Sequence, residues 1–191
     1  MSARTRTFLA LTLPAAARAA AAEVSAALRP RTAPRAVKWV APENLHMTLR
    51  FFGPLDEERL ARARRLVQDL EAVWEAVETH WTGLGAFPSL RRVQVIWLGL
   101  EDPSGALRAT AREVERRLVR AGFGRTDKPF AAHVTLGRVR RGERVAWESL
   151  SERLTMPEAP FSIKRMVLFK SVLTPTGPQY TPIDAAGARC E

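Results

Sequence analysis

The distribution of apolar and polar residues predicts strands and helices that follow one another along the whole chain. Apolar residues alternate partly with threonine over residues 5–13, which is typical of a strand. Pro14 suits the first turn of a helix that we expect to run to about Leu28. The other expected elements are strands at 37–40, 45–52, 80–87, 93–100, 131–139 and 161–173, and helices at 57–77, 105–121 and 146–154. This interleaving predicts an α+β fold.

Several polar and turn residues mark the expected boundaries. Gly53 and Pro54 predict the end of the strand at 45–52, and Asp56 is a suitable N-cap for the helix that follows. Gly122 predicts the C-terminal end of the helix at 105–121, and a turn at 175–178 completes the predicted elements. No linker or low-complexity segment divides the chain, so we expect one domain over residues 1–191.

The charge of the chain favours an anionic partner. Thirty Lys and Arg residues face 20 Asp and Glu residues, which gives a formal net charge of +10, and nucleic acid is the usual partner of such a surplus. Only four of the basic residues are lysines, and this bias is also typical of a GC-rich genome, so the charge alone does not establish the partner. The hydrophobic fraction of 46% is enough for a packed core.

The single cysteine and the apolar runs bear on location. Cys190 has no partner for an internal disulfide, which fits a reducing compartment, and we expect a cytoplasmic protein. Arg4 and Arg6 before an apolar run resemble a signal peptide, but that run stops at Pro14, so we interpret it as the first strand. No apolar run approaches the roughly 20 residues that cross a membrane.

A repeated four-residue motif carries the candidate chemistry. His-x-Thr-Leu occurs at His46–Leu49 and again at His133–Leu136, and the chain has three histidines in all. Chance at this composition would give such a pair on the order of once in several thousand chains. The two copies therefore point to an internal duplication with a shared role.

Strand geometry explains the spacing within the motif. Residues i and i+2 of a strand point to the same face, so His46 projects with Thr48, and His133 with Thr135. Imidazole suits proton transfer near neutral pH, and hydroxyl groups donate to oxyanions. If two such strands face one cleft, an acid, a base and donors between them can act on a phosphodiester.

These motifs make the chain similar to the two-histidine phosphoesterase superfamily, and within it to the LigT-like RNA 2′,3′-cyclic phosphodiesterases, also called ThpR. The resemblance covers nearly the whole chain. Its segments are 6–10, 13–14, 39–40, 42–49, 51–53, 85–88, 97–99, 122–123, 130, 133–138, 171–173, 177–178 and 180. Ala132 departs from the usual proline and Arg50 from the commoner lysine, and neither change removes a catalytic group.

The resemblance implies two pseudo-symmetric lobes whose antiparallel sheets line a central cleft, with helices on the outside. It implies that His46 protonates the leaving oxygen, that His133 activates water, and that Thr48 and Thr135 bind the phosphate. Arg138 would add a cationic contact. Strict alternation points Arg138 away from His133, so the strand must bulge or end there.

The resemblance implies that the substrate is RNA with a 2′,3′-cyclic phosphate end, which is opened to a 2′-phosphate. We assume a monomer and expect no metal or other cofactor. We expect a bell-shaped pH dependence with flanks near the ordinary histidine pKa of about 6.5. Catalytic zinc generally takes three protein ligands, and the motif supplies two histidines. Two alternatives stay open: the reverse reaction, a 2′–5′ RNA ligase, and an RNA-binding module without catalysis.

The aromatic residues divide into two groups in this interpretation. We expect the core to contain four of them: Phe51, Phe52, Phe87 and Trp97. Phe130 lies in a polar loop and is the better candidate for stacking on a nucleobase.

Overall fold

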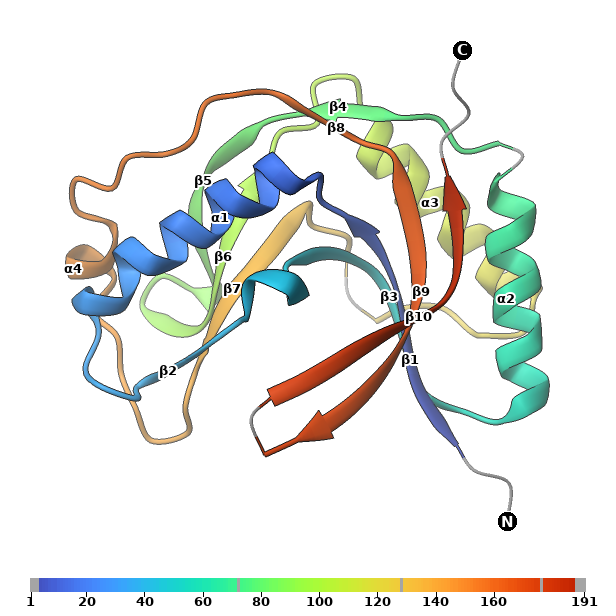
Figure 1. The fold of residues 1–191 in the computed structure, drawn as a ribbon, viewed down its shortest axis with the longest axis horizontal. Helices are drawn as coiled ribbons and strands as arrows, with labels where there is room; N and C mark the ends of the chain where they lie inside the picture. Colours follow the sequence, from blue (N-terminus) through green and yellow to red (C-terminus); the bar gives the residue numbers. More distant parts are fainter. Residues whose placement is uncertain (1–3, 72, 128, 176, 188–191) are drawn as a thin grey trace.

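Two four-stranded antiparallel sheets dominate the protein (Figure 1). The computed structural model describes residues 4–71, 73–127, 129–175 and 177–187, so Cys190 lies outside the described residues. The first sheet has the strand order β10-β9-β1-β3 and the second has the order β2-β7-β6-β5, while β4 and β8 form a separate pair. The α+β class predicted from the sequence is confirmed, and all strand pairs are antiparallel within the described residues.

The elements have the following bounds. The strands are β1 (Thr5–Thr12), β2 (Val37–Trp39), β3 (His46–Leu55), β4 (Val77–Thr79), β5 (Trp81–Ser89), β6 (Arg92–Leu100), β7 (His133–Val139), β8 (Phe161–Ile163), β9 (Arg165–Thr174) and β10 (Gly177–Gly187). The α-helices are α1 (Ala15–Leu28), α2 (Glu57–Glu71), α3 (Ala106–Arg120) and α4 (Trp147–Ser151), and the 3-10 helices are η1 (Arg29–Arg31) and η2 (Pro42–Asn44).

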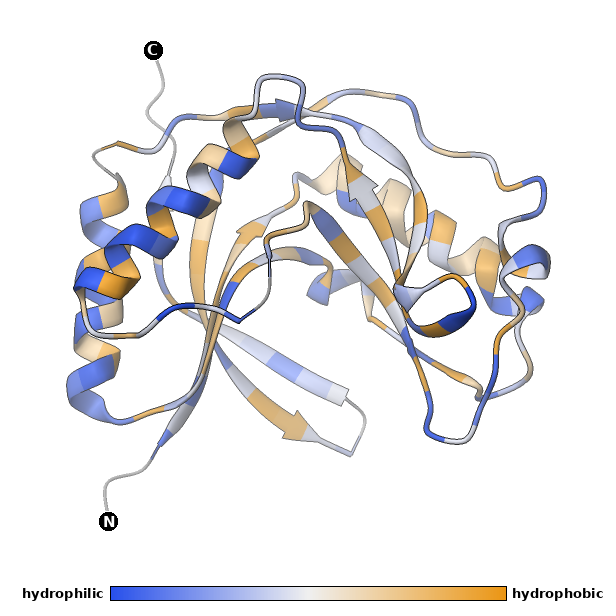
Figure 2. Ribbon diagram, turned by 180° about the vertical axis from the view of Figure 1, so that it is seen from behind, coloured by the Kyte–Doolittle hydropathy of each residue, from blue (hydrophilic) through white to orange (hydrophobic). Residues whose placement is uncertain are grey.

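The long helices cover the sheets from outside. Helix α1 contacts β7 of the second sheet, whereas α2 contacts β10, β9 and β3 of the first, and α3 contacts α2 and β3. Hydrophilic and hydrophobic segments alternate along α2 and α3 (Figure 2), as expected for helices with one face on a core. In α3 the inward face consists of Leu107, Ala111, Val114 and Leu118.

One cluster of buried side chains includes residues of both sheets. Leu9 and Leu11 of β1, Leu98 of β6 and Leu136 of β7 are completely buried members of it. Because β3 and β7 also contact each other, the two sheets meet at the strands that carry the His-x-Thr-Leu motifs. The core thus fixes these two strands relative to one another.

Two predicted boundaries are confirmed by their capping geometry. The Asp56 carboxylate accepts a hydrogen bond of 2.9 Å from the backbone N–H of Arg59, which is the geometry of an N-cap. Gly122 follows α3 with φ of 79°, the left-handed conformation that glycine adopts at little cost.

Other predicted boundaries differ from those of the structure. The helix expected at 57–77 ends at Glu71, and the region after it contains β4 from Val77. The strand expected at 161–173 is divided into β8 and β9. The prediction missed β10, which includes Pro178 and Pro182; this strand lies at the edge of its sheet, where missing N–H donors are tolerated. Strand β3 continues through Gly53 and Pro54 to Leu55.

Candidate active site

The two predicted histidines occupy equivalent positions at the start of two strands. His46 is the first residue of β3 and His133 is the first residue of β7. Thr48 and Thr135 follow two residues later, and all four side chains are half-buried. We use the name histidine face for the side of the two sheets on which these histidines lie.

A bulge interrupts β3 directly after its motif threonine. Thr48 pairs with Ala10 of β1, but Arg50 pairs with the neighbouring residue Leu9. Leu49 therefore has no partner in β1. An extra residue of this kind bends the strand and shifts the alternation of side chains beyond it.

The same bulge occurs in β7, at the equivalent residue. Thr135 pairs with Trp97 of β6, and Gly137 pairs with Ile96, which leaves Leu136 as the extra residue. The burial pattern agrees, because Leu136 and Gly137 are both buried and Arg138 is exposed. The duplication seen in the sequence thus extends to an irregularity of the backbone.

The two bulges decide which residues join the histidine face. In β7 the shift turns Arg138 to the side of His133, so the interruption predicted for this strand is confirmed. The residue of β3 at the same position after its bulge is Phe51, whose side chain is 59% exposed. The expectation that Phe51 belongs to the core was wrong, because simple alternation does not allow for the bulge.

The hydrogen bonds of both rings fix the same tautomer. Nδ1 of His46 lies 2.6 Å from the carbonyl oxygen of Asn44, and Nδ1 of His133 lies 2.8 Å from that of Ala131. A carbonyl oxygen only accepts, so each Nδ1 carries the hydrogen and donates it. In the neutral ring Nε2 is then the basic nitrogen, and in His46 it lies 3.0 Å from the Thr48 hydroxyl oxygen.

Aromatic rings enclose His46. Its ring centroid lies 4.9 Å from that of Phe8 and 5.4 Å from that of Tyr180, which meets it edge-on. The pKa of His46 is lowered from 6.5 to about 4, mainly because the ring is buried; the charges of His133 and Arg138 contribute to the decrease, and the hydrogen bond to Asn44 opposes it. His46 is therefore neutral near pH 7 in the free protein.

His133 has an aromatic environment of its own. Phe87 lies edge-on at a centroid distance of 5.0 Å, and Trp97 lies at 5.9 Å. The indole of Trp97 occupies the space above Gly85, where an added Cβ would approach it to 2.2 Å. Burial lowers the pKa of His133, and the charge of Arg138 adds to this effect. Both histidines thus sit where the cationic form is disfavoured.

Arg138 influences three titratable groups of this face. Its charge lowers the pKa of His46, of His133 and of Tyr180, although burial raises the Tyr180 pKa overall. Since all three effects are coulombic, Arg138 is close to both halves of the site. A bound anion would find one guanidinium near two imidazoles there.

Arg50, directly after the first motif, forms hydrogen bonds with residues that precede the second motif in the chain. Its guanidinium donates to the Glu115 carboxylate at 2.6 Å and to the carbonyl oxygens of Phe123 at 3.2 Å and Gly124 at 3.0 Å. The other carboxylate oxygen of Glu115 accepts from the backbone N–H of Thr126 at 2.6 Å. This bonding needs several donors in a plane, which arginine supplies and lysine does not.

A pocket of about 250 Å³ lies beside His46. It is lined by Thr12, Arg18, Glu43, Asn44, Leu45, His46, Phe169, Tyr180 and Pro182. Phe130 lies elsewhere, in a pocket of about 260 Å³ with Asp102 and Arg108. In the described part of the chain no ring contact joins Phe130 to either histidine, and its stacking role stays a prediction.

The sequence interpretation missed several residues of the site. Phe8 and Tyr180 surround His46, yet both come from strands far from it in the sequence. Tyr180 belongs to β10, the strand that the sequence did not predict. Within the described residues no three His, Cys, Asp or Glu side chains gather as a metal site, and no helix is long and apolar enough to cross a membrane.

The sequence is similar to a known protein family and to known proteins over most of its length. Residues 13–174 match the sequence profile of the 2′-5′ RNA ligase superfamily. The RNA 2′,3′-cyclic phosphodiesterase of Methanothermobacter thermautotrophicus is 34% identical over 184 residues, covering 95% of this chain and 97% of that protein. The RNA 2′,3′-cyclic phosphodiesterase of Archaeoglobus fulgidus is 36% identical over 144 residues, or 75% of this chain and 80% of that protein.

Solved structures give the same result. A protein of Thermus thermophilus superimposes with a TM-score of 0.80 at 30% identity, covering 97% of this chain and 99% of that one. E. coli LigT in complex with 3′-AMP superimposes with a TM-score of 0.71 at 26% identity, covering 97% of this chain and 98% of that one.

Proposed function

The chain belongs to the 2′-5′ RNA ligase superfamily, and from this premise we propose that it hydrolyses 2′,3′-cyclic phosphate ends of RNA to 2′-phosphate ends. The observation that carries the proposal is the pair of imidazoles on one face, each held by its Nδ1 so that Nε2 is the nitrogen left for chemistry. The relatives that bear the name RNA 2′,3′-cyclic phosphodiesterase support the choice of substrate.

In the proposed reaction the two histidines act on opposite sides of the phosphorus. Neutral His133 accepts a proton from water while the water oxygen bonds to phosphorus. The bond from phosphorus to the 3′ oxygen breaks, and the imidazolium of His46 donates its proton to that oxygen. The product carries a 3′-hydroxyl and a 2′-phosphate, and proton exchange with solvent restores both rings.

Three further residues would serve the phosphate. Thr48 and Thr135 share the histidine face and would donate hydroxyl hydrogens to its oxygens. Arg138 would stabilise the charge that grows on them in the transition state. Phe51, exposed on the same face, offers a flat apolar surface beside the nucleotide.

The proposal includes three broader statements. The chain works as one two-lobed domain, since the buried cluster joins both sheets. Two imidazoles supply both proton transfers, so the reaction proceeds without a metal ion. The protein works in the cytoplasm, where a single cysteine stays reduced.

Two alternatives make different demands on the same site. A 2′–5′ ligase would run the reaction backwards and must hold a second RNA with its hydroxyl in place of water. An RNA-binding module would need no proton transfer at all. The paired Nε2 atoms favour catalysis over simple binding, and the concentration of water favours hydrolysis over ligation.

The test is turnover of a mononucleoside 2′,3′-cyclic phosphate by histidine variants. His46→Ala and His133→Ala should each lower kcat by roughly 10²–10⁴-fold, and the double variant should be little worse than either, because the two groups act as a unit. His80→Ala is the matched control, since His80 is exposed and outside the motifs. If either motif variant keeps more than a tenth of the activity, the assignment is wrong.

A further inference from the structure

A cluster of basic residues continues the site along β2 and β7, two neighbouring strands of the second sheet, and along the segments next to them. Segments 35–38 and 138–144 contain six basic residues and one acidic residue, Glu143. The six, which we call the β2–β7 basic edge, are Arg35, Lys38, Arg138, Arg140, Arg141 and Arg144. All six are exposed, and β2 is the edge strand of its sheet.

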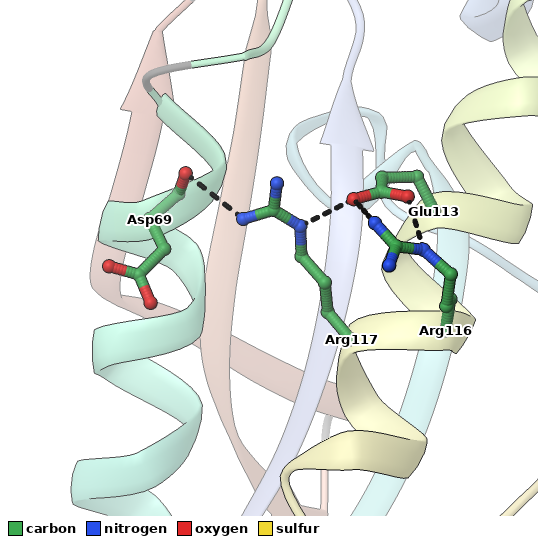
Figure 3. Close-up of polar contacts among 4 residues, drawn as sticks. All are labelled: Asp69, Glu113, Arg116 and Arg117. Atoms are coloured by element: carbon green, nitrogen blue, oxygen red, sulfur yellow. Dashed lines mark hydrogen bonds and ion pairs between the residues drawn. The ribbon is translucent and has the colours of Figure 1, made fainter.

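Among the described residues, the charges of this edge are not neutralised by carboxylates, in contrast to those of Arg116 and Arg117 on α3. On α3, Glu113 pairs with Arg116 at 2.5 Å and with Arg117 at 2.6 Å, and Arg117 also donates to the carbonyl oxygen of Asp69 in α2 (Figure 3). Across the residues that the structure describes, no ion pair involves any member of the β2–β7 basic edge.

The strand register arranges part of this edge in a row that starts at the histidines. Lys38 of β2 lies directly opposite Arg138 of β7, so the two side chains share the histidine face. Arg140 follows Arg138 at i+2, about 7 Å further along the strand, and its N–H bonds to the carbonyl oxygen of Ala36 at 2.8 Å, which continues the pairing with β2.

Directly opposed like charges cost free energy unless an anion compensates them. Lys38 and Arg138 form such a pair at the border of the site. Because Arg138 also acts on both histidines through its charge, the row begins where the reacting phosphate would bind. Neighbouring phosphates of a nucleic acid strand have a comparable repeat, so several could meet these cations in succession.

We propose that the β2–β7 basic edge binds the phosphodiester backbone upstream of the cyclic end, so that the preferred substrate is an oligonucleotide rather than a mononucleotide. This inference rests on the proposed function, which supplies the terminal nucleotide at the histidines. Lys38 and Arg140 contact upstream phosphates, whereas Arg138 contacts the reacting one.

The experiment compares two substrates, a tetraribonucleotide with a 2′,3′-cyclic end and a mononucleoside 2′,3′-cyclic phosphate. The readout is the ratio of their kcat/KM values. Lys38→Ala and Arg140→Ala should each lower the ratio about two- to fivefold, the range of one exposed ion pair. The matched controls Lys164→Ala and Arg65→Ala, which change exposed residues off this edge, should leave the ratio unchanged.

Salt dependence gives a second readout on the same proteins. A plot of log kcat/KM for the tetranucleotide against log salt concentration should lose about 0.7 of slope for each phosphate contact removed. An unchanged ratio and slope in both variants would overturn the inference, and so would an equal loss on both substrates. If the unmodified protein turns over neither substrate, the proposed function fails instead, and the same slopes measured on tetranucleotide binding then decide the inference.

Discussion

The lowered pKa of His46 leads to a prediction about pH. In the free protein this pKa is about 4, so at pH 7 only about one molecule in a thousand carries the imidazolium that the proposed acid needs. The bound substrate changes this balance because its phosphate carries a negative charge next to the ring. At about 4 Å and an effective dielectric constant of about 20, that attraction is worth roughly 4 kcal/mol, or about three pKa units.

The free and substrate-bound proteins should therefore show different pH profiles. The profile of kcat/KM reports the free protein, and its alkaline decline should lie below pH 6.5, since burial lowers the pKa of His133 as well. The profile of kcat reports the complex. In the complex the pKa of His46 should be about three units higher than in the free protein, so the decline of kcat should lie near pH 7. The limbs belong to the coupled pair rather than to one histidine.

The assay is steady-state turnover of a mononucleoside 2′,3′-cyclic phosphate from pH 4 to pH 9, with circular dichroism as a check on folding. Tyr180→Ala should move the limb of kcat/KM that His46 sets to higher pH, because it exposes His46 to water and weakens the cause of the lowered pKa. Coincident limbs for kcat and kcat/KM, or a kcat/KM limb above pH 6.5 in the unmodified protein, would refute the reasoning.

Three other predictions concern the charges and the metal. Arg138→Ala should lower kcat about 10²-fold and raise KM, measured at fixed salt, and an unchanged kcat would contradict a contact with the reacting phosphate. Arg50→Ala leaves the Glu115 carboxylate without its cation and should lower the free energy of unfolding in urea by about 2–3 kcal/mol. Glu58→Gln, which removes the exposed pair with Arg62, should cost less than about 1 kcal/mol, and equal losses would show that the Arg50 pair has no special role. Activity should survive EDTA followed by dialysis, and restoration of lost activity by one divalent ion would overturn the metal-independent chemistry.

The repeated motif made the centre of the site predictable from the sequence. Because residues i and i+2 share a face of a strand, the spacing within the motif is enough to group His46 with Thr48. The bulges after the motifs could not be located in this way, since they depend on the pairing with β1 and β6. The bulges explain why Arg138 lies on the side of His133, as predicted. They also explain why the assignment of Phe51 to the core was wrong.

The electrostatics of the site also depended on distant segments. The sequence suggested histidine pKa values near about 6.5. Phe8 and Tyr180 enclose His46 and contribute to the burial that lowers its pKa, and they lie on β1 and β10 rather than on β3. Because β10 contains two prolines, the sequence pattern did not predict it as a strand. No local pattern therefore indicated that Tyr180 would lie beside His46.

The most direct test of the central claim is product analysis on a short RNA that ends in a 2′,3′-cyclic phosphate. The protein is incubated with this RNA, and the product is treated either with an enzyme that removes only 3′-phosphates or with a nonspecific phosphatase. We expect a 2′-phosphate, which resists the first enzyme and is removed by the second. A cyclic end that stays closed, or a product that both enzymes dephosphorylate, would contradict the account.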